Sequence, residues 1–274
     1  MDYGEKKRAL QNYLHDLTKH NVAVAFSGGV DSSLLLHQCC KAAKQNSTKV
    51  YAVTMQTELH PQSDIVIARK VANEAGAKHI VIKIDELEEA GIGMNPENRC
   101  YLCKLSLFKM IQEEACRLGI SNIVEGTNED DLHVYRPGIQ ALKELNIISP
   151  FAKFNISKEE VRKMAEELGI SVSGRASTPC MATRFPYGTK LSKDLMQKVA
   201  EVEEWLRNKG VYNIRLRVHG NIGRFEVDRN DMPMFLEKWK EIAERTKHIG
   251  LDYVTLDLEG FRSGSMDIKM KINN

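Results

Sequence analysis

Long apolar runs and an excess of one charge are both missing from this 274-residue sequence. No stretch approaches the roughly 20 consecutive apolar residues that cross a bilayer, and the N-terminal MDYGEKKRALQNYLHDL lacks the apolar core of a signal peptide. The sequence therefore predicts a soluble, cytoplasmic protein with no membrane partner. The 39 basic and 37 acidic residues give a formal net charge of +2, which argues against a dedicated nucleic-acid binder.

Cysteine is scarce and irregularly spaced, which makes a disulfide framework the weakest interpretation. The six positions are Cys39, Cys40, Cys100, Cys103, Cys116 and Cys180. In a chain that looks cytosolic, this pattern favours metal or redox chemistry for some thiols and burial for the others. Cys39 and Cys40 lie in an apolar helical stretch, and Cys116 follows Ala115, so we expect these three to be buried.

Short β-branched runs alternate with helical stretches over the first two thirds of the chain. The expected strands are 21–26, 50–56, 78–84, 122–127 and 147–151, and the expected helices include 32–46, 64–76, 105–119 and 157–169. The last helix begins with a capping box from Ser157 to Glu160. Strands that alternate with helices predict an α/β domain with a parallel sheet covered on both faces.

Residues 171–191 contain two prolines and two glycines without a clear period, which is typical of a long functional loop. We place the domain boundary there, with a first domain at 1–185 and a second at 186–274. The second domain is expected to contain a helix (192–208), two strands (213–220 and 223–229), a helix (234–247) and a strand (252–260). This order predicts a small α+β unit of about 80 residues.

The string SGGVDSS, residues 27–33, joins the first expected strand to the first expected helix. Two adjacent glycines allow several backbone amides to point at one place, and a helix N-terminus adds free N–H groups and a positive dipole end. Both features favour an anion site. No lysine follows the glycines, so this is not the common nucleotide-binding loop. A glycine turn in which Asp31 and Ser32 only cap the helix would explain the glycines equally well.

The string, with its strand and helix, resembles the PP-loop of the ATP pyrophosphatases, which include GMP, NAD and argininosuccinate synthetases and tRNA-thiolating enzymes. In that group the loop holds the pyrophosphate of ATP while a substrate oxygen attacks the α-phosphate and forms an adenylate. The resemblance implies ATP and Mg²⁺ as ligands and a catalytic role for Asp31. It also implies that Gly126 and Thr127, in GTNEDD, line the ATP side and that these residues surround the pyrophosphate: Ser27, Gly28, Gly29, Asp31, Ser32 and Ser33.

Cys100 and Cys103 form a C-x-x-C in NPENRCYLCK, which we expect in a loop leading into a helix. The motif alone leaves zinc, an iron–sulfur cluster, a redox pair and a structural pair open. Cys180 is a third candidate ligand, and the arginines at 175 and 184 would favour its thiolate. Three cysteines favour an incompletely ligated iron–sulfur cluster over a closed zinc site, although a fourth ligand could come from His79, His133 or His219.

Three segments, 175–192, NIRLRVHG with GRFEV, and 250–267, resemble the LarE family of ATP-dependent sulfur transferases, and the similarity runs through the chain. Members adenylate a carboxylate of a pyridinium dicarboxylic acid mononucleotide, and sulfur then displaces AMP to give a thiocarboxylate on the way to the nickel-pincer nucleotide. Some members sacrifice a loop cysteine as the sulfur donor. Others add a C-x-x-C and bind a [4Fe–4S] cluster through three cysteines, with a sulfide on the remaining iron.

The resemblance implies a [4Fe–4S] cluster on Cys100, Cys103 and Cys180, a small pyridinium nucleotide as substrate, sulfide or another sulfur donor, and a homo-oligomer. Arg184 would be catalytic, and the substrate phosphate or a metal would lie by Arg215, Arg217, Glu203 and Glu226. An R-x-R on a strand is also compatible with an ordinary exposed surface. A tRNA thiolase remains an alternative, but it predicts a broad basic face and an RNA-binding module. A sacrificial-cysteine enzyme without a cluster is a second alternative. An amide-forming ligase of the GMP or NAD synthetase kind would leave the three cysteines unexplained, and a non-catalytic nucleotide- or metal-binding sensor would bind ATP without releasing pyrophosphate.

Overall fold

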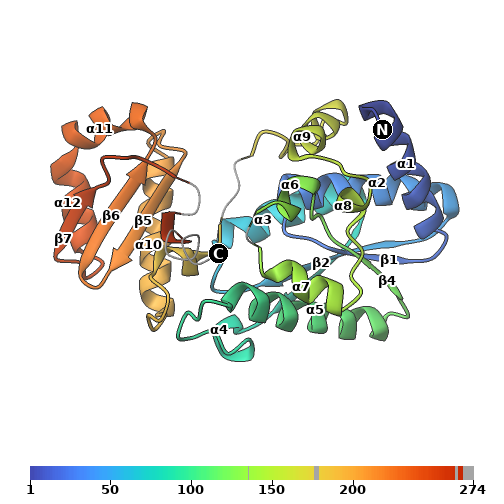
Figure 1. The fold of residues 1–274 in the computed structure, drawn as a ribbon, viewed down its shortest axis with the longest axis horizontal. Coiled ribbons are helices and arrows are strands. Elements are labelled where there is room, and N and C mark those ends of the chain that lie inside the picture. The colour runs from blue at the N-terminus through green and yellow to red at the C-terminus, as the bar shows by residue number, and fades with distance from the viewer. Residues whose placement is uncertain (135, 176–178, 263–264, 268–274) are drawn as a thin grey trace. The chain divides into compact units, whose positions relative to one another are not determined.

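The computed structural model describes residues 1–134, 136–175, 179–262 and 265–267, and the chain separates into two compact units (Figure 1). The first unit comprises Met1–Thr57, Gln62–Ile92 and Asn98–Ser177. The second comprises Glu58–Pro61, Gly93–Glu97 and Thr178–Asn274. The chain thus changes unit for the last time inside the expected loop, whereas the boundary expected at 185 lies within the second unit. Two short segments from the first third of the chain also belong to the second unit.

A four-stranded parallel sheet in the order β3-β2-β1-β4 forms the centre of the first unit. Its strands are β1 (Val22–Ala25), β2 (Val50–Gln56), β3 (Lys78–Lys83) and β4 (Asn122–Val124). Val22 of β1 pairs with Val50 of β2 on one side and with Asn122 of β4 on the other. The predicted α/β class with a parallel sheet is therefore confirmed.

Helices cover both faces of this sheet, as predicted (Figure 1). One face packs against α1 (Tyr3–Leu17), α2 (Val30–Asn46), α3 (Gln62–Ala75) and α9 (Lys158–Glu167), and the other against α5 (Arg99–Arg117) and α7 (Gly138–Glu144). Short helices α4 (Glu86–Glu89), α6 (Glu129–Leu132) and α8 (Pro150–Lys153) lie in the connections. Successive residues of β1 alternate between the two faces, with Val22 and Val24 in one hydrophobic cluster and Ala23 in the other.

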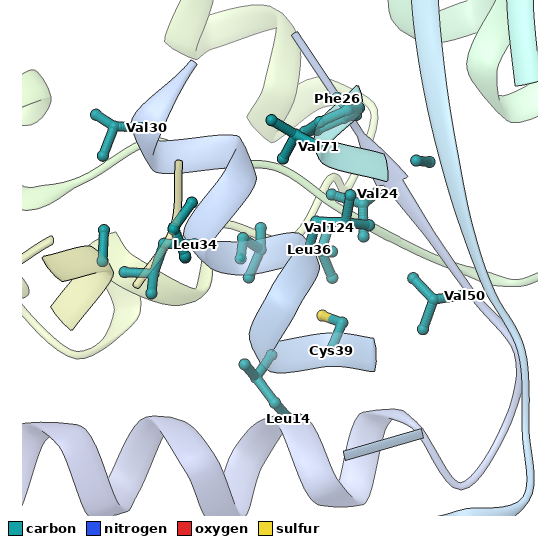
Figure 2. Close-up of a cluster of buried hydrophobic side chains, with 14 of the residues drawn as sticks. Leu14, Val24, Phe26, Val30, Leu34, Leu36, Cys39, Val50, Val71 and Val124 are labelled. Carbon is teal, nitrogen blue, oxygen red and sulfur yellow. The ribbon is translucent and has the colours of Figure 1, made fainter. Parts of the chain in front are cut away.

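The larger hydrophobic cluster fills the space between β1 and α2, and Figure 2 shows its aliphatic side chains converging there with Cys39. Burial raises the pKa of the Cys39 thiol, and it raises that of the half-buried Cys40 to about 12. These two cysteines therefore serve packing, as expected. The expectation for Cys116 was wrong, because this side chain is exposed on α5 while its neighbour Ala115 faces the core.

Two element boundaries also differ from the predictions. The expected strand 147–151 is only an isolated parallel bridge between Ile148 and Val124, since Pro150 begins α8 two residues later. Helix α5 begins at Arg99, six residues before the expected helix, so the C-x-x-C lies inside the first turns of a helix and not in a loop. The apolar period that defined the helix begins only with the side chains that reach the core, at Phe108.

The second unit contains a three-stranded sheet in the order β5-β6-β7, antiparallel between β5 and β6 and parallel between β6 and β7. Its elements are β5 (Ile214–His219), β6 (Ile222–Val227), β7 (Tyr253–Leu256), α10 (Lys193–Arg207), α11 (Met232–Glu237), α12 (Trp239–Lys247), η1 (Met181–Arg184), η2 (Arg229–Asp231) and η3 (Ser265–Asp267). The expected helix 234–247 is divided at Lys238. Nowhere in the described part of the chain is a helix both long and apolar enough to span a membrane.

We predict that Phe151→Ala destabilises the first unit, because Phe151 is fully buried in the larger hydrophobic cluster. Removing the ring should lower the free energy of unfolding by about 3–5 kcal/mol. Val66→Ala on α3 is the control, since Val66 is 70% exposed, and should change it by less than about 0.5 kcal/mol. Urea unfolding followed by circular dichroism measures both; equal midpoints would contradict the packing described.

Candidate functional site

The turn between β1 and α2 contains the glycines, serines and aspartate predicted to hold an anion. Gly28 has a φ of +74°, and a Cβ there would lie 3.1 Å from the Ala68 Cα, so only glycine fits. Gly29 is the N-cap of α2 and provides no side-chain cap, which leaves the first N–H groups of the helix available to a ligand. Asp31 and Ser32 lie within the helix, so the interpretation that they only cap it does not hold.

The serines of this turn bind one another. The Ser27 and Ser32 hydroxyls lie 3.2 Å apart, and the Gly29 N–H donates to the Ser27 Oγ at 3.3 Å. Ser32 also donates to the Gly29 carbonyl, whereas Ser33 is fully buried. The exposed part of the turn is therefore backbone amide and serine hydroxyl, which is a suitable lining for a phosphate group.

The end of β4 lies directly against this turn. A Cβ on Gly126 would lie 3.0 Å from the Ser32 nitrogen and 3.1 Å from the Asp31 carbonyl carbon, so a glycine is required for this approach. Thr127 instead turns toward Glu125, which is 6% exposed and accepts bonds from the Thr127 N–H at 3.0 Å and hydroxyl at 2.8 Å. Gly126 thus lies beside the predicted phosphate loop, while the Thr127 hydroxyl is committed to a buried carboxylate.

Two side chains that the sequence analysis did not assign hold Asp31. The Asn128 Nδ2 donates to the Asp31 Oδ1 at 3.0 Å, and the Lys158 ammonium forms a close ion pair with the Asp31 Oδ2. Lys158 therefore reaches the loop in space, although no lysine directly follows the two glycines in the sequence. Lys158 is the first residue of α9, at the positive end of the helix dipole, where a cation is disfavoured. A lysine in this unfavourable position, next to the capping box, was the feature of the sequence from which a role for Lys158 could have been inferred.

The cysteine pair lies at the start of α5. Cys100 is exposed, and Cys103, one turn further along the same face, is half-buried and donates its thiol to the Glu86 Oε1 at 2.6 Å. Glu86 is fully buried on α4. A Cβ on Gly138 would lie 3.1 Å from the Cys100 carbonyl oxygen, so the start of α7 packs closely on this turn. The helix turn that carries both cysteines is therefore closely packed, with the Cys103 thiol held by a buried carboxylate and the Cys100 side chain exposed.

The histidines that might have completed a zinc site have other partners or places. His79 pairs with the Thr54 hydroxyl at 2.8 Å, and burial lowers the pKa of its ring. His133 pairs with Glu129 at 2.8 Å, and His219 lies on β5 in the second unit. Within the residues described, no three His, Cys, Asp or Glu side chains come together in a way that could hold a metal ion.

Cys180 belongs to the second unit, in a loop fastened by residues from far earlier in the chain. The Met181 N–H donates to the Leu59 carbonyl at 2.9 Å. Asn95 is fully buried, and its side-chain Nδ2 donates to the backbone carbonyls of Phe185 at 3.0 Å and Pro186 at 2.8 Å. The backbone carbonyl of Asn95 accepts from the Gly188 N–H at 3.0 Å. Asn95 adopts a φ of +48°, a conformation that asparagine tolerates well. Asn95 was not identified from the sequence.

Arg184, predicted to be catalytic, fastens the same loop from inside. Its guanidinium is fully buried and makes a bidentate pair with Glu203, with Nε–Oε1 at 2.8 Å and Nη2–Oε2 at 2.7 Å. The remaining nitrogen, Nη1, donates to the Pro179 carbonyl at 3.2 Å and the Thr183 hydroxyl at 2.9 Å. These bonds engage every side of the guanidinium, so Arg184 holds the loop that contains Cys180.

The two acidic residues predicted beside the substrate phosphate neutralise buried arginines. Besides Arg184, Glu203 accepts from Arg207 and from the Leu216 N–H, each at 2.8 Å. Burial alone would raise the pKa of Glu203, but Arg184, Arg207 and this amide outweigh it and lower the pKa. Glu226 is fully buried and pairs with Arg217 at 2.8 Å and with Arg224 at 3.0 Å.

Arg215 is the arginine of this group whose positive charge is least balanced by neighbouring carboxylates. It is 7% exposed, donates to the Ile214 carbonyl at 2.7 Å and lies 5.1 Å from the centre of the Phe261 ring. No carboxylate lies within ion-pair distance of it in the described residues. Burial, followed by repulsion from Arg184, lowers the pKa of Arg215 to about 10, so it remains charged at neutral pH. A buried, charged guanidinium without an acidic partner favours a bound anion.

We predict that Gly126→Ala weakens ATP binding, because the added methyl group would push on the backbone of residues 31 and 32. We expect the dissociation constant to rise about tenfold or more, as overpacking typically costs 1–3 kcal/mol. Gly174→Ala is the control, since a Cβ there meets open space at an ordinary φ. Isothermal calorimetry with ATP would test both variants; unchanged affinity in Gly126→Ala would contradict the close approach.

We also predict that Arg184→Met accelerates alkylation of Cys180 by iodoacetamide, since the loop carbonyls lose their buried donor. Breaking a buried pair should also cost about 3–5 kcal/mol of stability. Arg207→Met is the matched control, because Arg207 shares Glu203 but is bonded to no residue of the loop in the described hydrogen bonds. Mass spectrometry of the Cys180 peptide measures the rate, at a temperature where both variants are folded. Equal rates in the two variants would refute the role of Arg184.

Comparison with known proteins places this site in a family. A family model described as a PP-loop domain matches residues 3–172. The chain is 36% identical to the uncharacterized protein slr1717 of Synechocystis over 97% of its length and 94% of the relative. It is 32% identical to the pyridinium-3,5-bisthiocarboxylic acid mononucleotide synthase of Lactiplantibacillus plantarum, over 96% of this chain and 94% of that protein.

A third relative comes from an archaeon. The chain is 32% identical to the uncharacterized protein MJ0830 of Methanocaldococcus jannaschii, over 96% of this chain and 100% of that protein. These similarities cover both units, and they join the PP-loop to the segments around Cys180 and Arg215. The chain belongs to the LarE family of PP-loop, ATP-dependent sulfur transferases.

Proposed function

We propose that the protein adenylates a carboxylate of pyridinium-3,5-biscarboxylic acid mononucleotide and replaces the bound AMP by sulfur, which yields a thiocarboxylate. The observation that carries the proposal is the end-to-end similarity to the mononucleotide synthase, joined to a phosphate loop without a side-chain cap. The product would serve in nickel-pincer cofactor synthesis. Each half-reaction can be assigned to residues of this chain.

In the adenylation half-reaction, the pyrophosphate of ATP would contact the turn from Ser27 to Gly29 and the first amides of α2. Asp31 would hold Mg²⁺, which would supply positive charge to the phosphates. Lys158, already beside Asp31, would supply a further positive charge. The turn and the first amides of α2 are in place before the reaction, so they stabilise the negative charge that develops on the leaving pyrophosphate without reorganisation.

The phosphate of the pyridinium nucleotide would bind on the arginine side of the second unit. Arg215 has no carboxylate partner in the described residues and Arg217 is held by Glu226, so an added phosphate would complete the charge balance. We assign Glu203 and Glu226 to holding the arginines in place. Bidentate arginine contacts suit a phosphate group better than lysine contacts would.

Sulfur would be carried by a [4Fe–4S] cluster on Cys100, Cys103 and Cys180. The donor type fits, because cysteine thiolates are the usual ligands of such clusters and these three positions supply three of the four. When bound, a three-cysteine cluster supplies one iron that can hold a sulfide.

We predict that Cys100→Ala and Cys103→Ala abolish multiple turnover with sulfide as donor, because either change removes a cluster ligand. Cys116→Ala, an exposed thiol on the same helix, is the matched control and should keep full turnover. Protein purified without oxygen should contain about four irons and acid-labile sulfide per chain. Thiocarboxylate, AMP and pyrophosphate are measured by mass spectrometry and phosphate release.

Three results would redirect this proposal. Loss of H₂S from Cys180 during a single turnover, in protein without iron, would favour the sacrificial-cysteine reaction. Formation of thiolated tRNA in place of the thiocarboxylate would favour a tRNA thiolase. Full turnover in Cys100→Ala would exclude the C-x-x-C from the sulfur step. The proposal also includes a source of sulfide or persulfide. It includes a homo-oligomeric assembly as well, which analytical ultracentrifugation tests.

A further inference from the structure

Both carboxylate oxygens of Asp31 are engaged, but by partners that differ strongly in burial. Asn128 is 2% exposed, donates its Nδ2 to the Asp31 Oδ1 at 3.0 Å, and uses its own Oδ1 to cap α6 at the Asp131 N–H. Its position is therefore fixed at both ends of the side chain. The Lys158 side chain, which holds the Oδ2, is 34% exposed and is a flexible tether to an ammonium group.

The backbone of Lys158 is held in place although its side chain is partly exposed. The Lys158 N–H donates to the Asp130 Oδ2 at 2.6 Å, and the Ser157 capping box sets the start of α9. The ammonium can thus pivot about a fixed Cα within reach of the loop. Helix stability alone disfavours a lysine at this first position, so an anionic partner is needed to account for it.

A partly exposed ion pair is weak and readily exchanged. Asp31 is 24% exposed in this pair, so water competes for both charges. A pyrophosphate group carries several negative charges against the single charge of Asp31, and it would attract the same ammonium more strongly. Asn128 is buried and uncharged, so the pyrophosphate would not draw its side chain away from Asp31.

We propose that the Asp31–Lys158 ion pair closes the metal site until a phosphate arrives. In the nucleotide-free protein Lys158 occupies the Oδ2, and a divalent cation cannot use it. The pyrophosphate group of the nucleotide takes the ammonium, which frees the Oδ2 for Mg²⁺, while Asn128 keeps the carboxylate oriented as a positioning residue. This inference rests on the proposed role of the loop in ATP binding and adds that metal and phosphate must bind together.

The test measures binding of Mn²⁺ alone, through the loss of the electron paramagnetic resonance signal of the free ion. Wild-type protein should bind Mn²⁺ weakly, and Lys158→Met should tighten binding by about tenfold or more because it frees a carboxylate oxygen. Lys158→Arg keeps the pair and should resemble the wild type. In Asp31→Asn/Lys158→Met the gain should disappear. Lys163→Met, on the same helix and with the same charge change, is the matched control.

A reciprocal measurement uses inorganic pyrophosphate in the presence of a chelator. Asp31→Asn should strengthen pyrophosphate binding more in the wild-type background than in Lys158→Met, because only the former has an ammonium to release. Equal gains in both backgrounds, or equal Mn²⁺ gains in Lys158→Met and Lys163→Met, would overturn the inference. Neither readout involves sulfur, so a failure to form thiocarboxylate would refute the proposed function and leave these results unaffected.

Discussion

Parallel pairing of β1 with β2 on one side and with β4 on the other is the constraint from which the nucleotide site follows. Strands that run in the same direction end at the same edge of the sheet, so the turn after β1 and the residues after β4 must meet there. Gly126 permits the meeting by lacking a side chain, and Asn128 and Lys158 then reach Asp31. The candidate active site is thus a consequence of strand direction, completed by side chains from distant parts of the sequence.

The sequence predicted the parts of the site that are local and missed those that are not. SGGVDSS was identifiable because a strand, a glycine turn and a helix follow one another without interruption. Lys158 lies 127 residues from Asp31, and Asn95 reaches carbonyls some 90 residues away. No period or spacing indicates such contacts. The start of α5 was misjudged for a related reason, since its first turns contact α4 and α7 and lack the apolar period of a helix on a core.

The second unit shows why the type of a residue predicts less than its burial. An R-x-R strand with two glutamates was expected to face a ligand with all four side chains. The structure buries nearly all of β5, on both faces, and buried charges must be matched. Glu203 and Glu226 are therefore bound to arginines, and Arg215 remains as the side chain with unbalanced charge. Which arginine keeps an unbalanced charge follows from these pairs and could not be derived from the alternation alone.

The second unit is not a continuous stretch of chain. The backbone passes between the units at five junctions, 57–58, 61–62, 92–93, 97–98 and 177–178, and the short segments it inserts carry Leu59 and Asn95, which fasten the cysteine loop. A fragment that starts near residue 178 would therefore lack the residues that shape its own loop. Recombination between relatives at a single crossover would separate them in the same way, so the three segments are expected to be inherited as one block.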